Sequence, residues 1–263
     1  MNAMPSRSAS WMCYILAVGS LALTTALLLG RGGGRAAKHD QKRVAKLVDD
    51  LANRNSAPQL VGHNGNLLPL FPAAYDWKEQ KRVQEALRRL ENDQTAEVWE
   101  EMIKKADDPR YALTFKNNSG VFAEDNRTVG RLCRQVAYDE LVGVFRQHLP
   151  DNPPDAPEMG EIDLDVGVYQ LGNLVEWREK RKDKTLSELQ IEVCEQALKE
   201  LAKAKGVPRH EKVQARKKIK AEIGKLRKTN RPILVRSDIL GSLDECYSAE
   251  EGKEFREKLR RKR

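Results

Sequence analysis

The strongest constraint on this chain is an uncharged apolar stretch close to its start, residues 12–29. As a helix, this stretch would rise about 1.5 Å per residue and reach about 27 Å, close to the roughly 30 Å hydrocarbon core of a bilayer. No comparable stretch occurs in the rest of the sequence. We therefore expect residues 1–30 to be a membrane anchor or a signal segment that contacts the lipid bilayer through residues 12–29.

A cleaved secretory signal is the main alternative to an uncleaved anchor. A signal has a basic start, an apolar run of about 7 to 15 residues and small residues before its cleavage site. Here Arg7 is the one basic residue ahead of a longer apolar run, and the best cleavage candidate, residues 34–36, lies past the end of that run. We therefore favour a single-pass anchor, whereas a cleaved signal would mean export. An apolar helix buried in a soluble core is disfavoured because the stretch has no polar face.

Flanking charge indicates on which side of the membrane the body of the protein lies. Arg7 precedes the apolar stretch, whereas a basic cluster follows it: Arg31, Arg35, Lys38, Lys42, Arg43 and Lys46. By the positive-inside rule, this asymmetry favours a cytoplasmic C-terminal body and argues against export. Met4 and Met12 are alternative start codons that would change the upstream charge, so we leave the orientation open.

The composition of the remaining chain favours helices. Charged residues make up 33% of the sequence and aromatic residues 6%, a balance typical of helices with solvated faces rather than of a β-sandwich. We expect a mainly α fold, with a Gly-rich spacer over residues 31–38, a helical domain over 39–149 and a basic helical region over 171–263. An acidic, Pro-rich linker over 150–170 separates the last two.

The spacing of apolar residues predicts about four helices in the domain over 39–149. The first three cover 41–51, 76–90 and 95–105, and the fourth begins after a cap at Asn126 or Thr128. The pattern therefore places most of this domain in helices.

The same domain is predicted to contain one β-hairpin and one long loop. Residues 110–115 alternate like a strand, 116–120 have turn chemistry and 121–123 read as the return strand. Residues 53–76 are expected to be the loop. It ends at Asp76, which with Glu79 three residues later matches a capping box.

The basic region is predicted to be a helical hairpin followed by a short helix. Residues 185–204 carry apolar side chains on one face, and Gly206 and Pro208 separate them from a second arm over 209–228. A capping box that begins at Ser248 opens the last helix. Two antiparallel arms of this kind are expected to pack through their apolar faces.

Net positive charge is concentrated in this basic region. Residues 171–263 contain 26 basic and 16 acidic residues, whereas the rest of the chain is near neutral. The arm over 209–228 has a narrow apolar stripe surrounded by cations, a pattern that can lie on anionic lipid or bind nucleic-acid phosphates. The candidate polyanion-binding residues are Lys212, Arg216, Lys217, Lys218, Lys220, Lys225, Arg227 and Lys228.

Three interpretations of this basic helix stay open. It is a solvated helix face that needs no ligand, partly neutralised by Glu/Lys pairs and the acidic linker; or it binds anionic lipid or an acidic protein surface; or it binds nucleic acid. Single-strand binders usually place aromatic residues among the basic ones for base stacking. None occurs between Trp177 and Tyr247, so nucleic acid is the least favoured partner.

No motif identifies an active site or a metal site. The Gly-x-Ser-x-Gly and His-Glu-x-x-His patterns are absent and the histidines are scattered. The acidic pair 107–108 is explained by a helix end, and residues 161–165 resemble the start of a calcium loop but lack its glycine. Arg131 and Arg134 could lower the pKa of Cys133, yet no histidine partner is identifiable. The cysteine spacing predicts neither a disulfide framework nor a zinc site.

Together these patterns predict a membrane-tethered, non-catalytic interaction or scaffold protein without a cofactor or a metal. The first alternative is an electrostatic binder of anionic lipid or nucleic acid through the helix over 209–228. The second is an enzyme whose site is assembled only by the fold. The specific partner and the oligomeric state are left open by the sequence.

Overall fold

The computed structural model describes residues 42–63, 66–116, 125–149, 174–204, 207–235, 237 and 246–260. The predicted membrane segment, the Gly-rich spacer and the acidic linker lie outside these residues, so the predictions made for them stay predictions. The chain divides into two compact units, Met1–Val44 and Ala45–Arg263, and the second contains the elements of the fold from Ala45 onward. Among the described helices, none combines the length and the apolar character needed to cross a bilayer.

The structure is mainly helical, as predicted, and the expected helix over 41–51 is present at 42–49. The long loop predicted over 53–76 is wrong in its middle. Strands β1 (Gln59–His63) and β2 (Asn66–Leu70) pair antiparallel there, in a register that places Gln59 opposite Leu70. The two intervening residues are Asn-Gly, the dipeptide most typical of a two-residue hairpin. The sequence therefore contained a hairpin signal at this position.

Helices α2 (Trp77–Asn92) and α3 (Ala96–Lys104) begin where the sequence predicts. The Asp76 carboxylate accepts hydrogen bonds from the first backbone N–H groups of α2, and the Thr95 hydroxyl does the same for α3. The capping box predicted for α2 is only half formed, because the Asp76 N–H donates to Asn55 Oδ1 instead of to Glu79. Glu79 instead accepts hydrogen bonds from the Arg82 guanidinium.

The predicted β-hairpin is present with a different return strand. β3 (Tyr111–Phe115) pairs antiparallel with β4 (Asp125–Thr128), whereas residues 121–123 lie outside the described part of the chain. Thr128 then caps α4 (Val129–Arg146) by accepting a hydrogen bond from the Arg131 N–H. This decides between the two predicted caps, because Asn126 is engaged elsewhere: it accepts from Thr114 Oγ1 and donates to Pro58 O.

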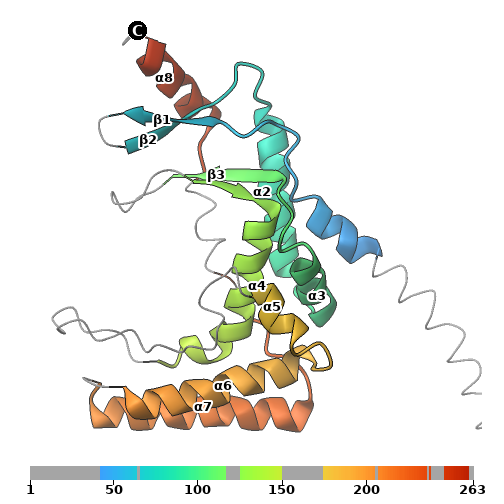
Figure 1. Cartoon of the computed structure of the whole chain (residues 1–263), viewed down its shortest axis with the longest axis vertical. Coiled ribbons are helices and arrows are strands. Elements are labelled where there is room, and N and C mark those ends of the chain that lie inside the picture. Colours follow the sequence, from blue (N-terminus) through green and yellow to red (C-terminus); the bar gives the residue numbers. More distant parts are fainter. Residues whose placement is uncertain are drawn as a thin grey trace, which may run out of the picture. The chain divides into compact units, whose positions relative to one another are not determined.

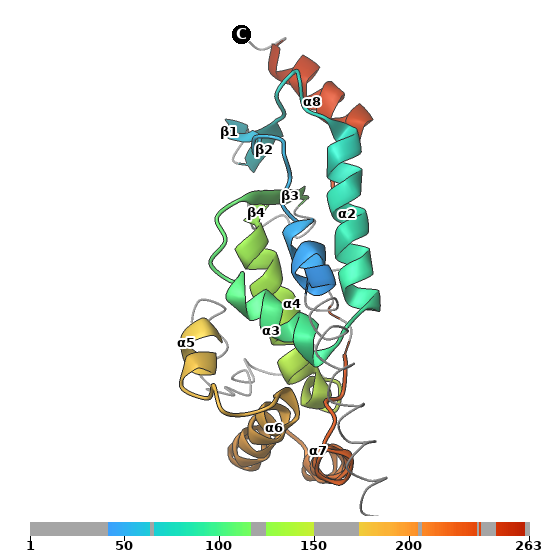
Figure 2. The same ribbon diagram turned by 90° about the vertical axis from the view of Figure 1, so that its right-hand side faces the viewer.

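Helix α4 is the centre of the fold, and helices from both sides of the predicted linker pack against it (Figure 1). The Trp99 indole of α3 donates to Ala137 O of α4, and α3 also contacts α5 (Leu174–Glu179). Helices α6 (Leu186–Lys203) and α7 (Arg209–Thr229) lie side by side across the C-terminal end of α4 (Figures 1 and 2). The predicted helical hairpin is thereby confirmed, whereas the predicted domain boundaries stay predictions.

The last helix, α8 (Ala249–Arg260), packs on β2. Its predicted capping box is formed in both directions: the Glu251 N–H donates to Ser248 Oγ, and the Ser248 N–H donates to the Glu251 carboxylate. Gly252 allows α8 to approach the start of α2 closely, because a Cβ there would lie 2.4 Å from Trp77 Cζ2. The rings of Phe71, Tyr75 and Tyr247 form a small aromatic core at this end.

Candidate functional site

The predicted basic helix is α7, and its amphipathic pattern positions its charged side chains. Four apolar residues, Ala215, Ile219, Ile223 and Leu226, are buried at helical spacing and form the predicted stripe. The helix ends at Asn230, whose backbone is left-handed (φ 49°) and donates its N–H to Leu226 O. Asparagine tolerates this conformation, so it ends α7 as a glycine would.

The structure divides the eight predicted polyanion-binding residues into two groups. Three are engaged within the protein: Lys212 donates to Ala204 O, Lys225 pairs with Glu222 at 3.7 Å and Arg227 pairs with Glu195 at 2.7 Å. The other five are exposed and form no ion pair with any described residue. We call these five the α7 cationic surface: Arg216, Lys217, Lys218, Lys220 and Lys228.

The α7 cationic surface faces outward and is largely separated from the carboxylates of the same helix. Lys217 and Lys228 are eleven residues apart, about three turns, so they share one side of the helix, opposite the buried stripe. Glu211 and Glu222 have the same spacing and share a flank of the helix, on which Lys218 and Lys225 also lie. From Arg216 to Lys228 the surface is about 18 Å long. Four of its cations, Arg216, Lys217, Lys220 and Lys228, therefore form a row that can meet several phosphates at once, whereas Lys218 lies on a flank.

Two cations that the sequence analysis did not select extend this row. Arg209 at the start of α7 and Arg231 just after its end are exposed and form no ion pair with a described residue. Arg209 lies inside the predicted arm over 209–228 and was not selected, although the sequence showed its charge. Arg231 was missed because it lies beyond the predicted end of that arm, and periodicity locates helix ends poorly.

The outer side of α7 has little apolar area to insert into a membrane. Within the described residues, the exposed large hydrophobic side chains are Val213, 59% exposed, and Leu234, 44% exposed. Val213 is the one that belongs to α7, and the other uncharged residues near it on the outer side include Ala221 and Gly224. Binding through this side therefore depends on charge rather than on insertion.

The cysteine and the acidic pair considered as catalytic candidates do not have the surroundings of reactive groups. Burial raises the pKa of the Cys133 thiol to about 12, which corrects the expectation that nearby arginines would lower it. Arg134 instead donates to Ala106 O and to the Asp107 carboxylate. Hydrogen bonds from Arg110 lower the pKa of Asp108, so the two carboxylates of this pair have separate partners.

Glu140 of α4 is a buried carboxyl group that the sequence analysis missed. It is fully buried, and neither side-chain oxygen has a hydrogen-bond partner among the described residues. Burial raises the pKa of Glu140 to about 8. Its surroundings include Gln190, whose amide donates both to Glu140 O and to Ile233 O.

In the described part of the chain, no group of three or more His, Cys, Asp or Glu residues could hold a metal ion.

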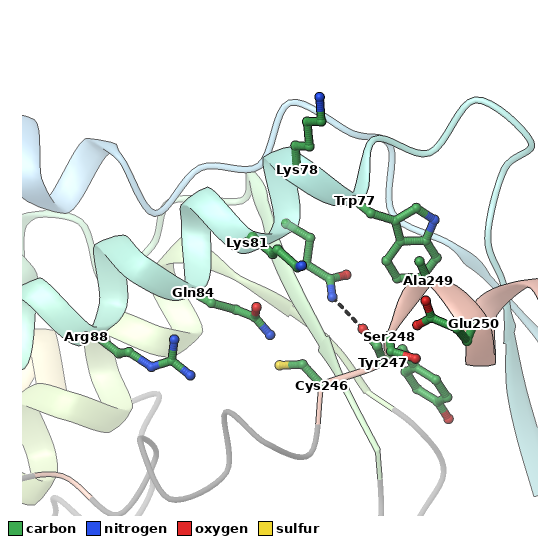
Figure 3. A pocket seen from close by; sticks show the side chains of 11 residues that line it. Trp77, Lys78, Lys81, Gln84, Arg88, Cys246, Tyr247, Ser248, Ala249 and Glu250 are labelled. Atoms are coloured by element: carbon green, nitrogen blue, oxygen red, sulfur yellow. Dashed lines mark hydrogen bonds between the residues drawn. The ribbon is translucent and has the colours of Figure 1, made fainter.

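A groove of about 320 Å³ lies between α2 and the start of α8, and the sequence analysis did not predict it (Figure 3). Trp77, Lys78, Lys81, Gln84 and Arg88 line its α2 side. Residues 246–250 line the other side. More than 150 positions separate these two walls in the sequence, so no local pattern could have shown the groove.

No protein-family model matches this chain, and neither a curated protein nor a solved structure does.

Proposed function

We propose that this protein is a membrane-tethered, non-catalytic interaction module whose α7 cationic surface binds an anionic lipid surface. The observation that carries the proposal is the division of charge on α7. Lys225 and Arg227 have carboxylate partners, whereas the five residues of the α7 cationic surface have none among the described residues. Unpaired cations of this kind are available to an external anion without the loss of an internal ion pair.

The expected strength of this contact suits a tethered protein. A Lys or Arg near an anionic membrane gains about 1 kcal/mol, so five cations supply about 5 kcal/mol, equivalent to sub-millimolar affinity. That is weak for a freely diffusing protein. A tether converts the encounter into an intramolecular one with an effective concentration in the millimolar range. The predicted anchor over residues 12–29 and the α7 cationic surface would therefore reinforce each other.

Lipid is favoured over nucleic acid because α7 and its neighbouring segments lack aromatic side chains. No aromatic residue lies between Trp177 and Tyr247, so the surface offers no side chain on which bases could stack. Lipid headgroups need no such stacking, because a row of charge on a helix suffices. The predicted membrane segment also keeps the protein at the surface that α7 would bind.

The proposal is tested with the full-length protein in lipid nanodiscs, by labelling of lysine amines and mass spectrometry. We expect Lys217, Lys218, Lys220 and Lys228 to be protected in nanodiscs containing phosphatidylserine but not in nanodiscs of phosphatidylcholine alone. High salt should remove the protection, because the contact is screened. Lys104 on α3 and Lys180 just after α5 are both exposed and report unspecific protection.

Charge-matched variants connect this protection to α7. We expect Lys225 to be protected in the wild type as well, and glutamine at all five positions of the α7 cationic surface should abolish this protection. The control removes five surface cations that already have a carboxylate partner: Arg89, Lys104, Lys180, Lys203 and Lys258. Equal protection of Lys225 in both variants would contradict the proposal. Protection by a DNA duplex but not by phosphatidylserine would favour nucleic acid instead.

A further inference from the structure

One carboxylate of α7 lies between a lysine of its own helix and a histidine that follows α4. Glu222 Oε2 is 3.7 Å from Lys225 Nζ, and Glu222 Oε1 is 3.5 Å from His148 Nε2. His148 comes two residues after the end of α4, and α4 contacts α7. Packing of the two helices therefore brings a second, titratable partner to the carboxylate that pairs with Lys225.

The contact between His148 and Glu222 is mostly shielded from water. The two side chains are 16% and 21% exposed. His148 Nε2 and Glu222 Oε2 are buried atoms, and neither has a hydrogen-bond partner among the described residues. Unpartnered polar atoms of this kind cost free energy. A proton on the imidazole turns the contact into a charge-assisted pair, which is stronger than a neutral one.

The other titratable and charged groups around this contact come from α6 and α7. Cys194 of α6 faces Glu222, and burial raises the pKa of its thiol to about 12. Glu195 of α6 has an arginine of α7 as its partner at 2.7 Å. Lys218 lies one turn before Glu222 on the same flank of α7. Among these described residues, His148 is the one whose side-chain type changes charge between pH 5 and 8.

We propose that His148 is a pH-sensitive switch of the α7 cationic surface. This inference rests on the lipid-binding function proposed above. While the imidazole is neutral, Glu222 pairs with Lys225. Once it is protonated, a state that the C-terminal end of α4 favours, the imidazole becomes the partner of Glu222 and Lys225 is free to join the α7 cationic surface. Lipid binding therefore strengthens as the pH falls, about fivefold for one more cation near an anionic membrane.

The test compares lysine protection at pH 7.5 and pH 6.0, with the full-length protein in nanodiscs. Protection is the ratio of labelling in phosphatidylcholine nanodiscs to labelling in nanodiscs with phosphatidylserine at the same pH, so the effect of pH on amine reactivity cancels. The salt concentration is chosen to halve the protection at pH 7.5. We expect binding to be about fivefold stronger at pH 6.0. Equal protection of α7 at both pH values would overturn the inference.

Variants of the three residues give the test a direction in both senses. Glu222→Gln frees Lys225 at every pH, so it should bind at pH 7.5 as strongly as the wild type does at pH 6.0, with little further increase. His148→Gln and Lys225→Gln should each remove the increase. The control is His210→Gln, because His210 is exposed on α7 beside Glu211. If it removes the increase and His148→Gln retains it, the switch is assigned to the wrong histidine.

The labelling of Lys225 without anionic lipid separates this inference from the lipid-binding function. In phosphatidylcholine nanodiscs alone, the labelling of Lys225 relative to Lys228 should rise about twofold from pH 7.5 to pH 6.0, the effect of losing one exposed ion pair. It should stay constant in His148→Gln. If the ratio rises but phosphatidylserine protects no lysine, the switch is supported and the lipid-binding function is wrong. A constant ratio in the wild type overturns the switch even where phosphatidylserine protects α7.

Discussion

Helices α4 and α7 have similar lengths but differ in the share of their residues that is buried. In α4, fourteen of eighteen residues are buried, and the helix contacts α3, α6, α7 and both strands of the second hairpin. In α7, four of twenty-one residues are buried, and the rest of the helix is exposed or half-buried. One helix is placed by packing on all sides, and the other by a single stripe. The comparison separates a part of the molecule that determines stability from a part that is free to determine binding.

The largest expected effect at a fixed pH comes from truncating the core of α4. Leu132 is fully buried, so Leu132→Ala should lower the free energy of unfolding by about 3 kcal/mol through lost burial and a cavity. Val213→Ala on α7, at 59% exposure, is the matched control and should change it by less than about 0.5 kcal/mol. Urea denaturation of both variants measures the difference. Similar effects at the two positions would break the comparison.

The next effect concerns the buried carboxyl of α4 and its dependence on pH. The pKa of Glu140 is about 8 in the folded protein, against 4.5 for an ordinary glutamate. The folded state therefore holds the proton more tightly than the unfolded state, so this contribution to stability is complete below about pH 4.5 and is lost as the pH rises through 8. Glu140→Gln cannot ionise, so it should retain about 4 kcal/mol of stability that the wild type loses between pH 4.5 and pH 8.

The measurement for Glu140 is the urea midpoint of both proteins between pH 5 and pH 8.5. We expect the advantage of Glu140→Gln to grow with pH across this range. Glu101→Gln serves as the control, because Glu101 is also nearly buried but pairs with Lys104 at 3.0 Å. A constant difference between Glu140→Gln and the wild type would show that Glu140 is not protonated in the folded protein.

A smaller effect on stability is expected from the α7 cationic surface. Glutamine at its five positions keeps helix propensity nearly unchanged and removes no internal ion pair with a described residue. The free energy of unfolding should therefore change by less than about 0.5 kcal/mol, while the protection by phosphatidylserine is lost. A large loss of stability would show that these cations support the fold, and α7 would then resemble α4.

The smallest effect separates paired from unpaired cations within α7. Arg227 and Glu195 are both largely exposed, so Arg227→Gln should reduce the free energy of unfolding by about 0.3 kcal/mol. Because Arg227 is already paired, the protection of Lys217 and Lys220 by phosphatidylserine should stay as in the wild type. Lysine labelling in nanodiscs checks this, and Lys220→Gln is the matched variant that should weaken protection.

Helix starts were predictable because each depends on neighbours in sequence. Thr128 and Ser248 hold backbone N–H groups no more than three residues away, and the structure confirms both of these predicted caps. The hairpin of β1 and β2 was missed because its strands lack the alternating pattern by which a strand is recognised in a sequence. Its strands are short, and apolar residues occupy both faces, so the alternation of a half-buried strand is absent.

The sequence alone determined that α7 is an amphipathic, strongly basic helix, because the order of residues decides its stripe and its charge. Only the tertiary structure decided which cations stay unpaired, since Glu195 lies on α6, 32 positions from its partner Arg227. The burial of Glu140 and the groove between α2 and residues 246–250 were decided in the same way. The physical reason is range: capping and periodicity act within a few residues, whereas ion pairing, desolvation and grooves depend on segments that only packing brings together.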